Sequence, residues 1–156
     1  MKLYGMILTI HIVTGFICLI SGLAAMFARK RRGLHTFAGE LYHASYVVVA
    51  VSAIILAILS WEKSAFLFFI AIFSYGFALW GYLSIKRRKR GFLGPHIGGM
   101  LGSYIGVVTA TLVTNADQLP FLQDLPYILV WLLPTIIGTP LIFYIGSKYA
   151  PKKVMP

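Results

Sequence analysis

The segment from Gly15 to Val51, GFICLISGLAAMFARKRRGLHTFAGELYHASYVVVAV, contains an apolar run, four consecutive basic residues (Arg29 to Arg32) and a second apolar run. A helix that crosses the hydrocarbon core of a bilayer, about 30 Å thick, needs roughly 20 mainly apolar residues. Both runs extend far enough to meet this requirement, and the basic residues between them suit a loop at the membrane surface. We therefore expect two transmembrane helices joined by a short cationic turn.

The composition of the whole chain indicates the same environment. Of its 156 residues, 59% are hydrophobic and 12% are charged, and the mean hydropathy is +0.84. A soluble core of this size could not bury so much apolar surface. We predict an all-α integral membrane bundle that forms a single transmembrane domain over residues 1–156, with five spans at about 4–28, 39–60, 65–85, 97–114 and 126–146.

The basic residues predict the orientation of the chain. Arg29 to Arg32 follow the first span, Lys86 to Arg90 follow the third, and Lys148, Lys152 and Lys153 follow the fifth. By the positive-inside rule, the N-terminus lies outside and the C-terminus is cytoplasmic. The expected location is the inner (cytoplasmic) membrane of the cell. This topology accounts for the net charge of +10 without nucleic-acid binding, and it predicts contact between the basic loops and anionic lipid headgroups.

Small and polar residues recur along one face of three spans. Membrane helices associate mainly through close packing of small residues and polar contacts. We therefore expect the first, second and fourth spans to pack at the centre and the bulky third span to face lipid. The three stripes are His11, Gly15, Cys18, Gly22 and Ala25; His35, Gly39, Tyr42, Tyr46, Val49 and Ala53; and Gly98, Gly102 and Gly106.

Four histidines lie in or beside the predicted spans. His35, His43 and His96 are expected near the cytoplasmic ends of the second and fourth spans, with Glu40 among them, whereas His11 is expected near the outer surface. Ionisable groups inside a membrane are functional candidates by default. The plainer alternatives are solvated interfacial residues and, for His11, a hydrogen bond between helices.

Three kinds of chemistry fit the inner histidines. Haem b needs one histidine from each of two facing helices, with arginines near its propionates; a transition metal needs three imidazoles and a carboxylate; and a proton or quinone site needs an imidazole that titrates near neutral pH. The candidate residues are His11, His35, His96 and Tyr42 for a cofactor, and His35, His43, His96 and Glu40 for a metal.

Other classes of function have less support. Glu40 and His43 have the Glu-x-x-His spacing of di-iron bundles, but the remaining ligands of such a site are missing. No nucleophile or acid–base pair stands out, which argues against an enzyme. Pro134 and Pro140 predict a kinked last span, a feature also found at transport sites. The alternative to a cofactor protein is therefore a small transporter, or an accessory subunit of a larger complex or homo-oligomer.

The segment from His11 to Tyr42, followed by ALWGYLSIKRRKRGFLGPH (Ala78 to His96), resembles a bacterial family of small polytopic membrane proteins known as a domain of unknown function. The resemblance covers the first four spans. It implies that His11, His35 with Tyr42, and His96 belong to a shared family design, and it implies no activity. Glu40 and His43 lie outside the motif, and an arginine expected near the outer end of the fourth span is replaced by Thr114 and Asn115.

Overall fold

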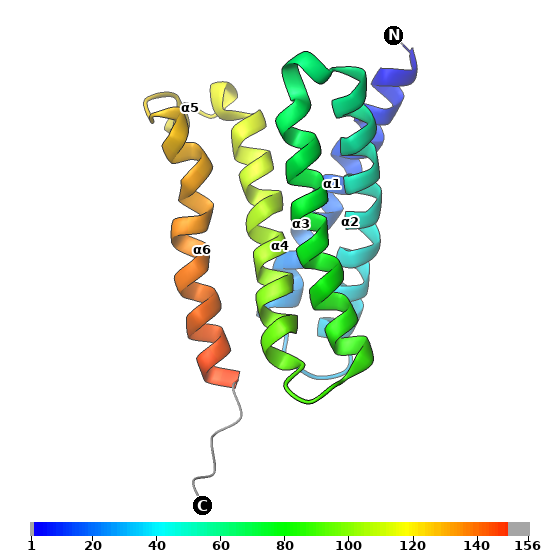
Figure 1. Ribbon diagram of the computed structural model, residues 1–156, viewed down its shortest axis with the longest axis vertical. Coiled ribbons are helices and arrows are strands. Elements are labelled where there is room, and N and C mark those ends of the chain that lie inside the picture. Colours follow the sequence, from blue (N-terminus) through cyan, green and yellow to red (C-terminus); the bar gives the residue numbers. More distant parts are fainter. Residues whose placement is uncertain (1, 150–156) are drawn as a thin grey trace, which may run out of the picture. The chain divides into compact units, whose positions relative to one another are not determined.

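A computed structural model of the chain describes residues 2–149, which are helical apart from short connections (Figure 1). Five of its helices are long and apolar enough to cross a membrane, which confirms the prediction of an all-α protein with five spans. The predicted orientation of the termini stays a prediction, and Lys152 and Lys153 lie outside the described residues. The elements are α1 (Lys2–Phe27), α2 (Leu34–Leu59), α3 (Trp61–Arg87), α4 (Leu93–Thr114), the 3-10 helix η1 (Ala116–Gln118), α5 (Pro120–Gln123) and α6 (Tyr127–Tyr149).

Two of the helices begin earlier than the hydropathy pattern predicts. α2 begins at Leu34 instead of residue 39, and α4 begins at Leu93 instead of residue 97. Gly33, with a φ of 122°, ends the first basic loop in a conformation that glycine adopts far more readily than other residues. The helix then follows at once, so its first turn contains polar residues that hydropathy excludes. As a result, His35 and His96 both lie in the first turn of a helix.

The connection between α2 and α3 is shorter than expected. The predicted spans at 39–60 and 65–85 leave the stretch WEKS, residues 61–64, as their connection, but α3 already begins at Trp61. The backbone carbonyl of Ser60 accepts hydrogen bonds from the N–H groups of Lys63 and Ser64, both at 3.0 Å. Glu62 lies in the first turn, where its negative charge interacts favourably with the positive end of the helix dipole.

The chain divides into two compact units, residues 1–76 and 77–156, and the prediction of a single domain stays a prediction. In the first unit, α1 packs along α2. Cys18 and Gly22 of α1 and Tyr42 and Tyr46 of α2 are buried, and the other members of both predicted stripes are at least partly buried. The stripe of α1 is therefore confirmed as a packed face, whereas most buried residues of α2, among them Ala38, Ser45 and Ser52, lie outside its predicted stripe.

In the second unit, α4 packs along α6. The segment between them lies outside the predicted spans, and it folds into η1 and α5 and contributes to a small apolar core. This core joins Val113 of α4 to Ala116, Leu122 and, in α6, Val130. Burial of these side chains holds the connection against the ends of both helices.

Two helix backbones come close together at Gly81 of α3 and Gly99 of α4. A Cβ atom placed on Gly99 would lie 2.6 Å from the Gly81 Cα atom and 2.7 Å from the Phe77 carbonyl oxygen. The prediction of close approach at Gly98 is wrong, because a Cβ atom there would have no atom within 4 Å. The contact is thus one residue away from the predicted glycine stripe.

The third span also differs from the prediction of a lipid-facing helix. Phe69 and Phe73 are exposed as expected, but Ala71, Ser74 and Ala78 are buried. α3 therefore has a packed face of small residues as well as a bulky apolar one.

The contact between Gly81 and Gly99 makes a specific prediction about stability. Gly99→Ala places a methyl group against backbone atoms that cannot move aside, so we expect a loss of about 1–3 kcal/mol of unfolding free energy. Gly98→Ala is the matched control and should leave stability within about 0.5 kcal/mol of the unaltered protein. Thermal unfolding of both variants in the same detergent measures the difference, and equal stabilities would contradict the contact.

Candidate functional site

His11 joins α1 to α2 through a hydrogen bond between side chains. Its Nδ1 atom lies 2.9 Å from the Oγ atom of Ser52. The Ser52 hydroxyl is also 2.7 Å from the carbonyl oxygen of Val48, one turn earlier in its own helix. Because a hydroxyl has one proton and donates it to that carbonyl, Ser52 accepts from His11, and the imidazole carries its proton on Nδ1.

His35 is bound to the C-terminal end of α1. Its Nδ1 atom lies 2.9 Å from the carbonyl oxygen of Ala25. Lys30 also donates to this carbonyl, at 3.0 Å, and to that of Met26. The last carbonyls of a helix have no partner within the helix, and basic side chains commonly supply one. Partial burial lowers the pKa of Lys30 from its ordinary value.

His96 makes the same kind of contact in the second unit. Its Nδ1 atom lies 3.0 Å from the carbonyl oxygen of Gly81 in α3, and its backbone N–H donates to Phe92, also at 3.0 Å. Gly81 is the glycine that meets Gly99, so the close approach of α3 and α4 also brings this carbonyl within reach of the imidazole. His96 is thus held at the contact between Gly81 and Gly99.

The three histidines that carry the family resemblance therefore share one tautomer. A carbonyl oxygen can only accept, so His35 and His96 must donate from Nδ1, as His11 does to Ser52. In each neutral imidazole the lone pair is then on Nε2. Histidines that bind metals or haem iron commonly donate from one ring nitrogen to a carbonyl or side chain in this way.

His43 and Tyr42 belong to an aromatic cluster in the first unit. The rings of His43 and Tyr75 are stacked with centroids 6.0 Å apart, and Tyr46 packs edge-on against both Tyr75 and Tyr42, at 5.8 and 5.5 Å. Tyr46 is also hydrogen-bonded to the side chain of Ser74. Tyr42 is only 2% exposed. These packing contacts account for the burial of both residues, and their roles as ligand or site residues stay predictions.

The histidines of the first unit lie far apart along the helix pair. His35 lies in the first turn of α2. Ser52, the partner of His11, lies 17 residues later in the same helix, which is roughly 25 Å along its axis. The structure thus separates His11 from His35, as expected. Within residues 2–149, no three His, Cys, Asp or Glu side chains gather closely enough to hold one metal ion. The metal set of His35, His43, His96 and Glu40 therefore has no support from the fold.

Sequence patterns did not identify the partners of the histidines. Ser52 could have been found, because it and Ser45 are polar residues seven positions apart in an apolar span, and this spacing places both on one face of the helix, where the structure buries them. The carbonyl groups of Ala25 and Gly81 have no such signal, since every residue has a backbone carbonyl. Tyr75 was missed because the third span was expected to face lipid.

Five apolar helices whose internal polar contacts are made by histidine, serine and backbone carbonyls define a polytopic helical membrane protein. Residues 8–138 match the model of the family described as "Predicted membrane protein (DUF2306)". The chain belongs to this family, whose function is unknown. Searches of curated proteins and of solved structures gave no match.

The hydrogen bond between His11 and Ser52 makes a second prediction about stability. Ser52→Ala removes the acceptor of the imidazole, and polar contacts between membrane helices contribute on average about 0.6 kcal/mol and at most about 1.7 kcal/mol. Ser84→Ala is the matched control, because Ser84 donates to the Trp80 carbonyl of its own helix at a similar distance. We expect Ser52→Ala to lower the thermal unfolding midpoint more than Ser84→Ala does. The reverse order would argue against the contact.

Proposed function

We propose that this protein binds haem b in the cytoplasmic membrane, with each haem iron held through Nε2 by one or two of the histidines His11, His35 and His96, and that it serves electron transfer. Haem iron can alternate between its ferrous and ferric states, which is the chemistry this cofactor supplies when bound. The observation that carries the proposal is the shared tautomer: each of these imidazoles donates its Nδ1 proton to the protein. Such a donor–acceptor contact orients the ring and increases the basicity of Nε2.

The donor set fits haem better than a bare metal ion. A haem iron needs one or two axial imidazoles, whereas a structural or catalytic zinc ion needs at least three protein ligands. Within residues 2–149 no such group of three ligands exists. A haem site needs only one or two histidines, so this finding does not count against it. The apolar surroundings of the spans also suit the porphyrin ring, which is mostly hydrocarbon.

The basic loops supply cations for the propionate groups of a haem. Arg31 and Arg32 are exposed and precede His35 by four and three residues. Arginine forms bidentate hydrogen bonds with carboxylates and keeps its charge at any physiological pH. In this proposal the imidazole of His35, in the first turn of α2, would hold the haem iron, and the guanidinium groups of Arg31 and Arg32, in the loop before it, would bind the propionates.

An absorption spectrum of the protein purified in mild detergent, with added haemin, tests the proposal. We expect a Soret band that saturates at a fixed ratio of haem to protein, and sharp bands typical of six-coordinate haem after reduction with dithionite. His35→Ala and His96→Ala should each weaken haem binding or change the coordination seen in these bands. Ser52→Ala should lower haem affinity at the His11 site about 10- to 100-fold, because outer partners of a ligating histidine commonly contribute that much.

The variant His43→Phe distinguishes the candidate site types. It keeps an aromatic ring against Tyr75, and His43 does not belong to the proposed haem ligands, so haem binding should stay unchanged. If His43→Phe abolishes binding of a transition metal, measured by elemental analysis, the metal site is correct and the haem proposal is wrong. A preparation that binds neither group, and is unaffected by His35→Ala and His96→Ala, leaves the transporter or accessory-subunit alternative.

A further inference from the structure

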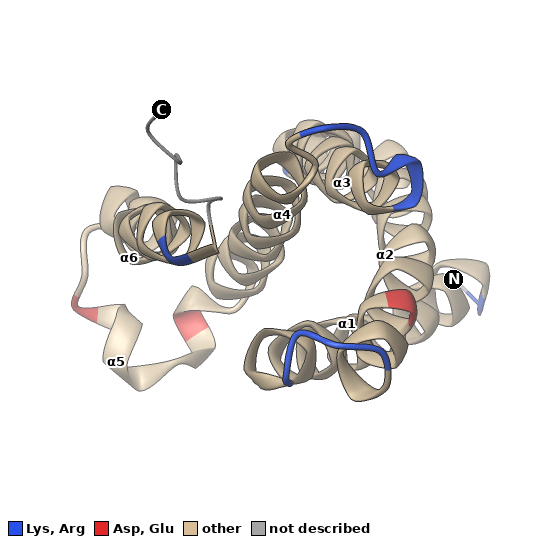
Figure 2. Cartoon of the chain, turned by 90° about the horizontal axis from the view of Figure 1, so that it is seen from below, with Lys and Arg blue, Asp and Glu red and all other residues tan. Residues whose placement is uncertain are grey.

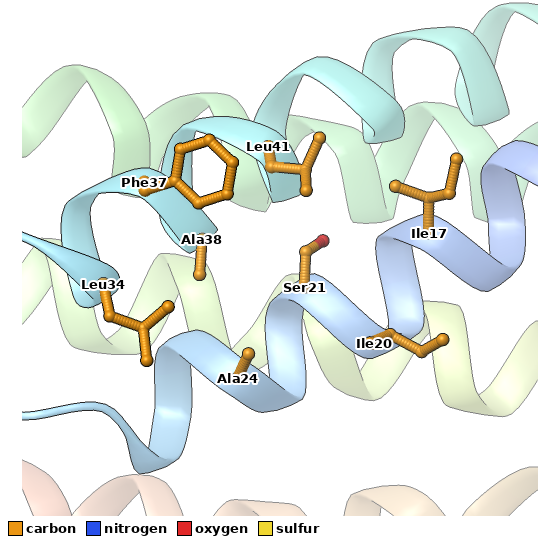
Figure 3. Close-up of a pocket in the computed structure, with 8 residues that line it drawn as sticks. All are labelled: Ile17, Ile20, Ser21, Ala24, Leu34, Phe37, Ala38 and Leu41. Atoms are coloured by element: carbon orange, nitrogen blue, oxygen red, sulfur yellow. The ribbon is translucent and has the colours of Figure 1, made fainter.

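An apolar groove lies between α1 and α2 in the first unit. Its walls come from Ile17 to Ala24 of α1 and from Leu34 to Leu41 of α2, and it encloses about 300 Å³ (Figure 3). Ser21 contributes the only polar side chain of the lining, and its hydroxyl donates to the Cys18 carbonyl of its own helix. The groove therefore offers a ligand little except apolar surface.

The groove results from the sizes of the side chains that line it. Ala24 and Ala38 are too small to fill the space between the helices, whereas Ile20 and Phe37, each 67% exposed, stand on either side. In a bilayer such a space is filled by hydrocarbon. The volume is at the lower limit of about 300–1,000 Å³ for small-molecule sites, and no histidine lines it. A single hydrocarbon chain fits these limits better than a macrocycle does.

The charges nearby determine which lipid the groove favours. Ala24 and Leu34 lie at the end of the groove that adjoins the loop of Arg29 to Arg32. Figure 2 shows this loop as a continuous basic segment between α1 and α2. Lys30 donates to carbonyls at the end of α1, which leaves the three exposed arginines to face the headgroup layer. From residue 17 to residue 60 the only acidic residue is Glu40.

We propose that this groove binds one anionic phospholipid, with an acyl chain between α1 and α2 and the phosphate against Arg31 and Arg32. Arginine pairs with phosphate through two parallel hydrogen bonds. The groove fixes the position of the acyl chain, and the loop selects the charge of the headgroup. The site would therefore bind a lipid more specifically than a basic loop that is only attracted to the membrane surface. The lipid proposal does not require haem, but it uses Arg31 and Arg32 for the phosphate, so a lipid and the propionates of a haem would compete for these two arginines.

Native mass spectrometry of the full chain in detergent tests this site. The unaltered protein is mixed with equal amounts of phosphatidylglycerol and phosphatidylcholine that have identical acyl chains. We expect one phosphatidylglycerol molecule to be retained per chain in preference to phosphatidylcholine. Equal retention of both lipids would show that the loop does not select the headgroup and would overturn the proposal. This comparison needs no altered residue, so it does not depend on the folding of a variant.

Two pairs of variants locate the site. Ala24→Leu fills the groove and should reduce phosphatidylglycerol retention at least tenfold, whereas Ala44→Leu, on the exposed face of α2 outside the groove, should not. Arg31→Gln with Arg32→Gln should weaken binding roughly 30-fold, or about 2 kcal/mol for two charges. The control is Lys89→Gln with Arg90→Gln, in the basic loop before α4. Circular dichroism and gel filtration confirm that each variant is folded.

Other occupants give different results. If Ala24→Leu has no effect, the lipid binds to the loop alone and the groove proposal is wrong. If the unaltered protein is a lipid-free dimer that Ala24→Leu dissociates, a second copy fills the groove, and the proposal is again wrong. Equal weakening by both double variants would mean that any basic loop suffices, which also contradicts a defined site.

Discussion

Inside a bilayer, helices gain little by exchanging lipid for protein, so their association depends on close backbone contact and on polar groups that find partners. In this chain such contacts are few and belong to particular residues. Gly81 meets Gly99 with no side chain between the two backbones, and His11 binds Ser52 across α1 and α2. The many exposed isoleucine, valine and phenylalanine side chains face outward, where lipid is their natural solvent. The buried positions are consequently rich in glycine, alanine and serine, together with a few valine, leucine and tyrosine side chains.

Hydropathy and charge were sufficient to predict five spans, because the spans depend on the average character of long segments. The starts of α2 and α4 were predicted four or five residues late, because hydropathy does not distinguish the polar residues in the first turn of a helix from those of a loop. The glycine contact was misplaced by one residue. One residue turns a helix by about 100°, and the choice between Gly98 and Gly99 depends on Gly81 in another helix, which no pattern within α4 can reveal.

The same limit applies to the histidines. The pattern identified His11, His35 and His96 as a set, and the structure adds that all three donate from Nδ1. It could not identify their acceptors, because two of these are backbone carbonyls, which have no sequence signature. It also suggested a four-ligand metal group that the described part of the chain does not assemble. Residue types near one membrane surface are thus a poor guide to which side chains meet.

The backbone contact at Gly81 and Gly99 also couples the spacing of two helices to the position of an imidazole. No side chain separates the backbones there, so α3 and α4 can be this close only while both positions are glycine. Because the Gly81 carbonyl also accepts the hydrogen bond of His96, any change that pushes the two backbones apart would also alter the distance between this carbonyl and the imidazole.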